Sequence, residues 1–256
     1  MKRTPVIALL LLAVLIVGVG CATVSLLESI EKLLADAKAL LDARKFDEAL
    51  TKLAEVIKRD PAQWKAYLYG AQAYIGKLDW TSALTNIRKA YQLAPSDTSV
   101  IATLGESLFG AGRDALQRGA FTDAVGHFVE YVKLRPTDAQ GYLNAGRAYL
   151  GNKSWTDAGR VLVDGLTKAS DPAARREFAS TLLDGGRQAL NLGDPKGAVS
   201  LLREYVKLEP ADVNAYLNLG KAYFNSGENL EALGAFRKVL ELSPQNEEAR
   251  RFLLGR

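Results

Sequence analysis

The most regular stretch of the sequence lies near its C-terminal end, at residues 213–246, and reads VNAYLNLGKAYFNSGENLEALGAFRKVLELSPQN. Its apolar and small residues recur three or four positions apart: Tyr216, Leu219, Gly220 and Tyr223 in the first half, and Ala232, Phe236 and Val239 in the second. Residues with this spacing share one face of an α-helix. Pro244 cannot continue the second helix and so ends it. The stretch therefore predicts two short antiparallel helices.

The same pattern occurs six times along the chain. The six windows of 34 residues span residues 30–63, 64–97, 105–138, 139–172, 179–212 and 213–246. We number the positions within each window as places 1 to 34. Place 20 is alanine in every window, at Ala49, Ala83, Ala124, Ala158, Ala198 and Ala232. Place 8 is always small, at Ala37, Ala71, Gly112, Gly146, Gly186 and Gly220. Place 24 is always large and apolar, at Leu53, Ile87, Phe128, Leu162, Leu202 and Phe236. Because small residues let two helix backbones approach, we expect a larger residue there to overpack the contact.

The repeated unit resembles the tetratricopeptide repeat, a 34-residue motif with Leu-Gly, Tyr, Ala, Phe and Pro at these offsets. The last window carries Leu219-Gly220, Tyr223 and Ala232 at the family's positions. The resemblance implies an all-α fold, a right-handed solenoid of six helix-turn-helix repeats. It also implies that the protein is not an enzyme and binds extended peptides or partner helices in a groove lined by the first helices. Residues 247–256 keep helical spacing, and we expect them to form the capping helix that an open repeat array needs.

Two short insertions lengthen every second repeat. Residues 98–104 precede the third window and residues 173–178 precede the fifth. Seven residues make about two helical turns, so we expect the insertions to extend the first helices that follow them. Their apolar residues, Val100, Ile101, Leu104 and Phe178, are expected to be exposed. At the other end of the chain, Ser25 and Glu28 form a capping box that is expected to start the first helix.

The N-terminus has the order of a secretory signal. Lys2 and Arg3 precede an unbroken apolar run, and small residues come directly before Cys21, the only cysteine. Residues 18–21 resemble the lipobox of bacterial lipoproteins, with Gly18 where that family usually has leucine. The resemblance implies that residues 1–20 are a cleaved signal peptide and that Cys21 becomes the lipidated N-terminus. Residues 21–29 would then hold the lipidated cysteine and the start of the first helix.

An uncleaved membrane anchor is the alternative, because residues 6–24 are apolar apart from Thr23 and nearly reach the length that spans a bilayer. In both cases the basic start stays inside, and the rest of the chain emerges beyond the cytoplasmic membrane. The expected location is the bacterial cell envelope. Ala22 after the cysteine, rather than aspartate, favours delivery of a lipoprotein to the outer membrane where the cell has one.

The composition argues against catalysis and against nucleic-acid binding. One histidine and one cysteine in 256 residues leave no zinc finger, no paired Cys/His nucleophile and no internal disulfide. We therefore expect no metal, no cofactor and no small-molecule substrate. Without Lys2 and Arg3 the chain has 31 basic and 29 acidic residues, which is no signal for nucleic acid. The glycines of residues 110–115 match a dinucleotide-binding turn, but they lie in a predicted helix, where close helix packing explains them.

The first helices carry the candidate binding residues. Place 9 holds Lys38, Gln72, Arg113, Arg147, Arg187 and Lys221, place 6 holds Asn144 and Asn218, and place 5 holds Leu68, Phe109, Leu143, Leu183 and Leu217. We expect the asparagines to hold the backbone of a partner and the residues at place 5 to add apolar contact. We call these thirteen residues the first-helix face. Five of its six place-9 residues are basic, and arginine suits bidentate contacts with the carboxylates of a partner. The alternative is that place 9 is simply a solvated helix face, on which duplication of the repeat copied the same arginine without any role in binding. The face lacks the lysine at place 5 and the asparagine at place 9 of the family's carboxylate clamp.

The sequence as a whole predicts a membrane-anchored adaptor of the bacterial envelope that holds a protein or peptide with acidic segments. The alternative is a structural protein that assembles with its own copies through the exposed apolar residues of the lengthened helices.

Overall fold

In the computed structural model, which describes residues 28–254, regular structure is helical throughout, as expected for an all-α repeat protein. The chain divides into two compact units, with the boundary between Ser107 and Leu108. Unit 1 contains α2 (Ile30–Asp42), α3 (Phe46–Arg59), α4 (Trp64–Gly76), α5 (Trp80–Leu93) and the first half of α6 (Thr98–Gln117). No helix between residues 28 and 254 is long and apolar enough to cross a bilayer.

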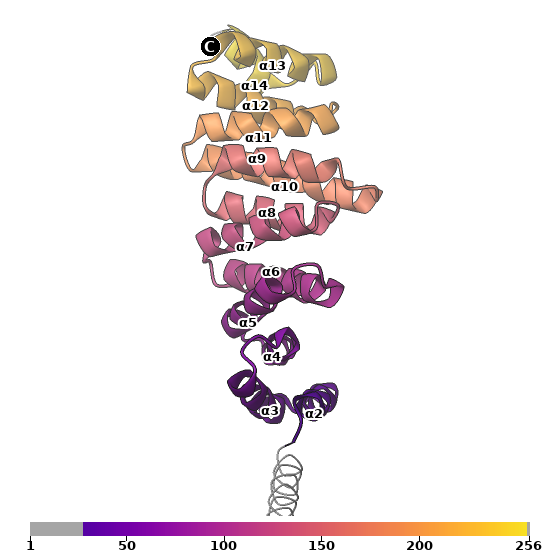
Figure 1. Ribbon diagram of the computed structural model, residues 1–256. Helices are drawn as coiled ribbons and strands as arrows, with labels where there is room; N and C mark the ends of the chain where they lie inside the picture. Colours follow the sequence, from indigo (N-terminus) through magenta and orange to yellow (C-terminus); the bar gives the residue numbers. More distant parts are fainter. Residues whose placement is uncertain (1–27, 255–256) are drawn as a thin grey trace, which may run out of the picture. The chain divides into compact units, whose positions relative to one another are not determined.

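Unit 2 continues the alternation of first and second helices. It contains α7 (Phe121–Leu134), α8 (Ala139–Gly151), α9 (Trp155–Leu166), α10 (Pro172–Asn191), α11 (Pro195–Leu208), α12 (Val213–Ser226), α13 (Asn229–Leu242) and α14 (Glu247–Leu254). The helices from α7 onward form a stack (Figure 1), and each packs against the next along the chain. Helix α9 also packs directly against α11.

Aspartates begin several of the helices. The carboxylate of Asp79 accepts a hydrogen bond from the backbone N–H of Ser82 at 3.0 Å, and Asp212 does the same for Ala215 at 3.0 Å. Each bond satisfies a backbone donor that the first turn of a helix leaves without a partner. The first described helix is capped in this way by Ser29, which accepts from Lys32 N at 3.1 Å. Helix α2 therefore begins at Ile30, with Ser29 as its N-cap. The capping box expected at Ser25 and Glu28 depends on Ser25, which lies outside the described residues.

The contact between the two helices of a repeat is built by places 8, 20 and 24. All six place-20 alanines are at most 2% exposed, and so are all six place-24 side chains. In unit 2 the place-24 side chain lies directly against the place-8 glycine. A Cβ on Gly112 would come within 2.7 Å of Phe128, and one on Gly220 within 2.7 Å of Phe236. Gly112 therefore serves helix packing inside α6, as the sequence predicts.

The insertions lie in helices, and most of their large apolar side chains are buried. Helices α6 and α10 each have 20 residues, whereas the first helices α2, α4, α8 and α12 have 13 or 14. The prediction that their apolar residues are exposed is wrong for three of the four: Val100, Leu104 and Phe178 are 0 to 4% exposed. Phe178 is buried because Gly165 on α9 leaves room for its ring, which lies 2.7 Å from where a Cβ would stand. The apolar surface expected for self-assembly is thus largely absent.

Helix α14 covers the apolar end of unit 2. Its Ala249 is fully buried, and the ring of Phe252 stacks on Phe236 with 4.4 Å between centroids and 10° between planes. Phe252 also meets Phe224 edge to face at 5.4 Å. The helix replaces the first helix of a next repeat, which would otherwise cover Phe236.

Candidate protein-binding face

The place-9 side chains lie at the solvent side of their helices, but they differ in charge pairing. Arg147 on α8 forms an ion pair with Glu177 on α10, with 2.7 Å between Nη2 and Oε1. Lys221 on α12 does the same with Glu248 on α14 at 2.7 Å. These two cations are partly neutralised by the protein itself.

Arg113 and Arg187 are different. Both are exposed, and neither forms an ion pair with any residue between 28 and 254. They lie 74 residues apart, at place 9 of the lengthened helices α6 and α10. The next first helices, α8 and α12, carry no acidic side chain, so neither arginine has a counterpart of the Glu177 that pairs with Arg147. In unit 2, Arg113 and Arg187 are therefore the place-9 cations with charge to offer a partner.

In unit 1 the place-9 residues contribute less charge. Lys38 pairs with Asp42 one turn later on α2, and Gln72 on α4 is uncharged and half-buried. Pairs of this i,i+4 type on a helix surface stabilise a helix by only a few tenths of a kcal/mol. The main consequence of the pair is that Asp42 partly neutralises the charge of Lys38.

The leucines at place 5 correct the expectation of an apolar contact surface. Leu68, Leu143 and Leu217 are 4%, 0% and 9% exposed. They are more deeply buried than the tyrosines that precede them at place 4, which are half-buried. Leu183 is half-buried against the same core, and Phe109 packs on Phe128 and Tyr131 with ring centroids 5.8 and 5.1 Å away. These five residues shape the floor of the face rather than its binding surface.

The asparagines at place 6 also differ from expectation. Asn144 is only 9% exposed and donates from Nδ2 to the backbone oxygen of Gln140 on its own helix, at 2.9 Å. That bond uses a donor that was expected to hold a partner's backbone. Asn218 on α12 is half-buried. In unit 2, the residues of the first-helix face that remain open to a partner are therefore mainly the place-9 cations.

The counter-charges of the face were not predicted from the sequence. Glu177 is the sixth residue of α10 and Glu248 lies in the first turn of α14, so each acid is on the next first-type helix after the one that carries the cation. A comparison of each place-9 cation with the start of the next first helix would have found them. Between residues 28 and 254 no cluster of three metal-ligating side chains occurs.

Comparisons with known proteins agree with this architecture. The profile of the tetratricopeptide repeat family matches the chain three times, at residues 34–98, 109–174 and 183–247, each time over a pair of windows. Superkiller complex protein 3 of Homo sapiens is 29% identical over 210 residues, which are 82% of this chain and 13% of that protein. The CTR9 homolog of Arabidopsis thaliana is 22% identical over 166 residues, which are 65% of this chain and 15% of that protein.

A solved structure of Naa15/Naa10 bound to HypK-THB has a similar fold, with a TM-score of 0.51 at 16% identity over 88% of this chain and 34% of that chain. The chain thus spans only a small part of these relatives. Tetratricopeptide repeats indicate a scaffold for protein–protein interaction. Since the three profile matches cover well over half of its length, the chain belongs to the tetratricopeptide repeat family.

Proposed function

We propose that the protein is a lipid-anchored adaptor of the bacterial cell envelope, which holds an acidic segment of a partner protein on its first-helix face. The observation that carries the proposal is the pair Arg113 and Arg187, two exposed guanidinium groups without an ion pair among residues 28–254. Guanidinium groups bind carboxylates through two parallel hydrogen bonds, which gives geometric specificity as well as affinity.

The anchor part of the proposal rests on the sequence alone, because residues 1–27 lie outside the described part of the chain. A basic start, an apolar run and a cysteine after small residues support lipidation at Cys21. Two or three acyl chains would make detachment negligible, since each buried methylene adds about 0.8 kcal/mol. Confinement of both partners to one membrane surface raises their effective concentration, so even a modest intrinsic affinity suffices.

Charge reversal of the two arginines tests the adaptor. The Arg113→Glu/Arg187→Glu variant should lose cross-linked partner proteins that the wild-type chain captures in the envelope, with an unchanged melting temperature. The Lys133→Glu/Lys196→Glu variant is the control, because it changes the net charge by the same amount. Both lysines are exposed, and both lie on second helices, outside the first-helix face. This control variant should capture the same partners as the wild type. If the wild type and both variants captured the partners equally, the first-helix face would have no binding role and the proposal would be wrong.

Substitution of the cysteine tests the anchor separately. The Cys21→Ser variant should lose incorporation of labelled fatty acid and should either leave the membrane fraction or accumulate as an uncut precursor. If the wild-type protein takes up no lipid label and keeps residues 1–20, the lipoprotein hypothesis is wrong and the N-terminus is an uncleaved membrane anchor.

A further inference from the structure

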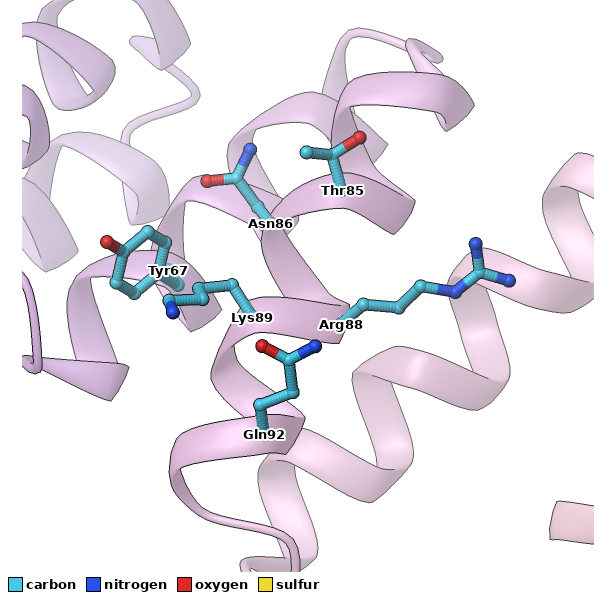
Figure 2. Close-up of a pocket in the computed structure, with 6 residues that line it drawn as sticks. All are labelled: Tyr67, Thr85, Asn86, Arg88, Lys89 and Gln92. Carbon is cyan, nitrogen blue, oxygen red and sulfur yellow. The ribbon is translucent and has the colours of Figure 1, made fainter.

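Unit 1 carries a polar hollow whose lining includes none of the residues of the first-helix face. It has a volume of about 490 Å³ and is lined by Tyr67, Thr85, Asn86, Arg88, Lys89 and Gln92 (Figure 2). Thr85, Arg88, Lys89 and Gln92 are spaced i, i+3, i+4 and i+7, so they form one stripe along the second helix α5, and Tyr67 faces them from α4.

The two helices that supply the lining residues carry no acidic side chain. Helices α4 and α5 contain no aspartate or glutamate, and they contain Lys65, Arg88 and Lys89. Arg88 already has an interaction partner within the protein. Lys89 is exposed and forms no ion pair among residues 28–254. In Figure 2 its side chain extends toward Tyr67, whereas Arg88 extends in the opposite direction.

The other repeats provide an internal comparison, because Lys89 stands at place 26. Four of the other five windows have an acidic residue there: Glu55, Glu130, Asp164 and Glu204. The sixth window has Lys238, which pairs with Glu241 on the same helix at 2.8 Å. The second repeat is thus the one in which place 26 is cationic and has no counter-charge on its own helix.

Two walls of the hollow are fixed by hydrogen bonds. Tyr67 donates its hydroxyl to the backbone oxygen of Pro61 at 3.1 Å, and Asn86 donates from Nδ2 to the backbone oxygen of Ser82 at 2.9 Å. Asn86 also packs against Gly70, where a Cβ would come within 2.9 Å of its Oδ1. The fixed walls leave the Lys89 ammonium and the Gln92 amide as donors that can turn toward a ligand.

We propose that this hollow binds a carboxylate side chain of an acidic peptide segment, with Lys89 as the charged donor and Gln92 as the neutral one. A single ammonium and an amide match the single charge and two oxygens of a carboxylate. The hollow lies on a second helix, so it is a site additional to the first-helix face, and either site can fail without the other.

The test measures binding of a fluorescent hexaglutamate peptide, capped at both ends, to the full-length chain in detergent by fluorescence anisotropy at low salt. Capped hexaglutamine is the uncharged reference and should not bind. The Lys89→Glu variant, which has the acidic place 26 of the other repeats, should bind hexaglutamate about tenfold or more weakly, as expected for loss of a charge-assisted hydrogen bond. The Lys238→Glu variant makes the same change in charge at the same place of the sixth repeat and should bind as the wild type does.

Binding that the two variants weaken equally would show attraction by net charge alone and would overturn the proposal. So would hexaglutamate that binds no better than hexaglutamine, since Lys89 would then be a hydrated surface lysine. The proposal would also be overturned if the Arg113→Glu/Arg187→Glu variant lost peptide binding and the Lys89→Glu variant did not. The hexaglutamate would then bind to the first-helix face and not in the hollow.

Discussion

Unit 1 and unit 2 use the same repeat but fill its closest helix contact differently. At place 8, unit 1 has alanines, Ala37 and Ala71, whereas unit 2 has four glycines. In unit 2 the place-24 side chain reaches the helix backbone itself, as Phe236 does at Gly220. In unit 1 a methyl group occupies that position. Leucine at place 24 packs with alanine in unit 1 (Leu53 and Ala37) and against glycine in unit 2 (Leu162 and Gly146), so the residue at place 24 alone does not decide which small residue stands at place 8.

The largest expected effect comes from filling the glycine contact in unit 2. Gly220→Val should lower the free energy of unfolding by roughly 1 to 3 kcal/mol, because Phe236 is fully buried and stacked on Phe252 and cannot move aside. Gly234→Val on the neighbouring helix α13 is the control, since a Cβ there meets nothing within 4 Å. Thermal unfolding followed by circular dichroism compares the two. A Gly220→Val protein as stable as Gly234→Val would mean that the contact is loosely packed.

The opposite change in unit 1 should cost less. Ala71→Gly removes only a methyl group and adds backbone freedom, which destabilises a helix by about 0.5 to 1 kcal/mol. The same unfolding measurement checks this value. A loss as large as that of Gly220→Val would show that unit 1 depends on place 8 as strictly as unit 2 does.

A smaller and pH-dependent effect comes from two tyrosines of unit 2. The hydroxyl of Tyr205 donates to Asp212 at 2.9 Å, and Tyr131 donates to Asp138 in the same way, so each bond ties a second helix to the start of the next first helix. Burial, with the nearby carboxylate, raises the pKa of each tyrosine from 10.0 to about 12. The folded state therefore favours the protonated phenol. Its stabilising contribution is complete below pH 10 and is lost as the pH rises through about 12.

Removal of both hydroxyls measures that contribution. The Tyr131→Phe/Tyr205→Phe variant should be less stable than the wild type at pH 7 by about 0.5 to 1.5 kcal/mol for each hydrogen bond. The difference in stability should shrink as the pH approaches 12, because the two hydroxyls of the wild type then lose their protons and with them these hydrogen bonds. A difference that stays constant between pH 9 and pH 12 would contradict the assigned pKa shifts.

The smallest effect is expected at the ion pair of Arg147. Glu177→Gln should change stability by less than about 1 kcal/mol, as exposed pairs usually do. It should instead strengthen the capture of an acidic partner, since Arg147 would join Arg113 and Arg187 as a cation without an internal counter-charge. Capture assays on Glu177→Gln and wild type check this, and weaker capture by the variant would place Glu177 itself in the binding surface.

The sequence predicted the interior better than the surface. Places 8, 20 and 24 are buried as predicted, because a 34-residue period forces each of them onto the same contact in every repeat. The burial of Phe178 and of Leu143 was missed, since it depends on which neighbouring helix covers them and not on the spacing within their own helix. The pairing of Arg147 with Glu177 was missed for the same reason. The hollow beside Lys89 could have been found from the acidic residues that the other repeats carry at place 26.

Photo-cross-linking from the surface of the folded protein tests the adaptor most directly. A benzophenone amino acid introduced at Arg113 or at Arg187 should cross-link to a partner protein in the envelope, and one introduced at Lys133 or at Lys196 should not. Cross-links from the two lysine positions, with none from the arginine positions, would contradict the assignment of binding to the first-helix face.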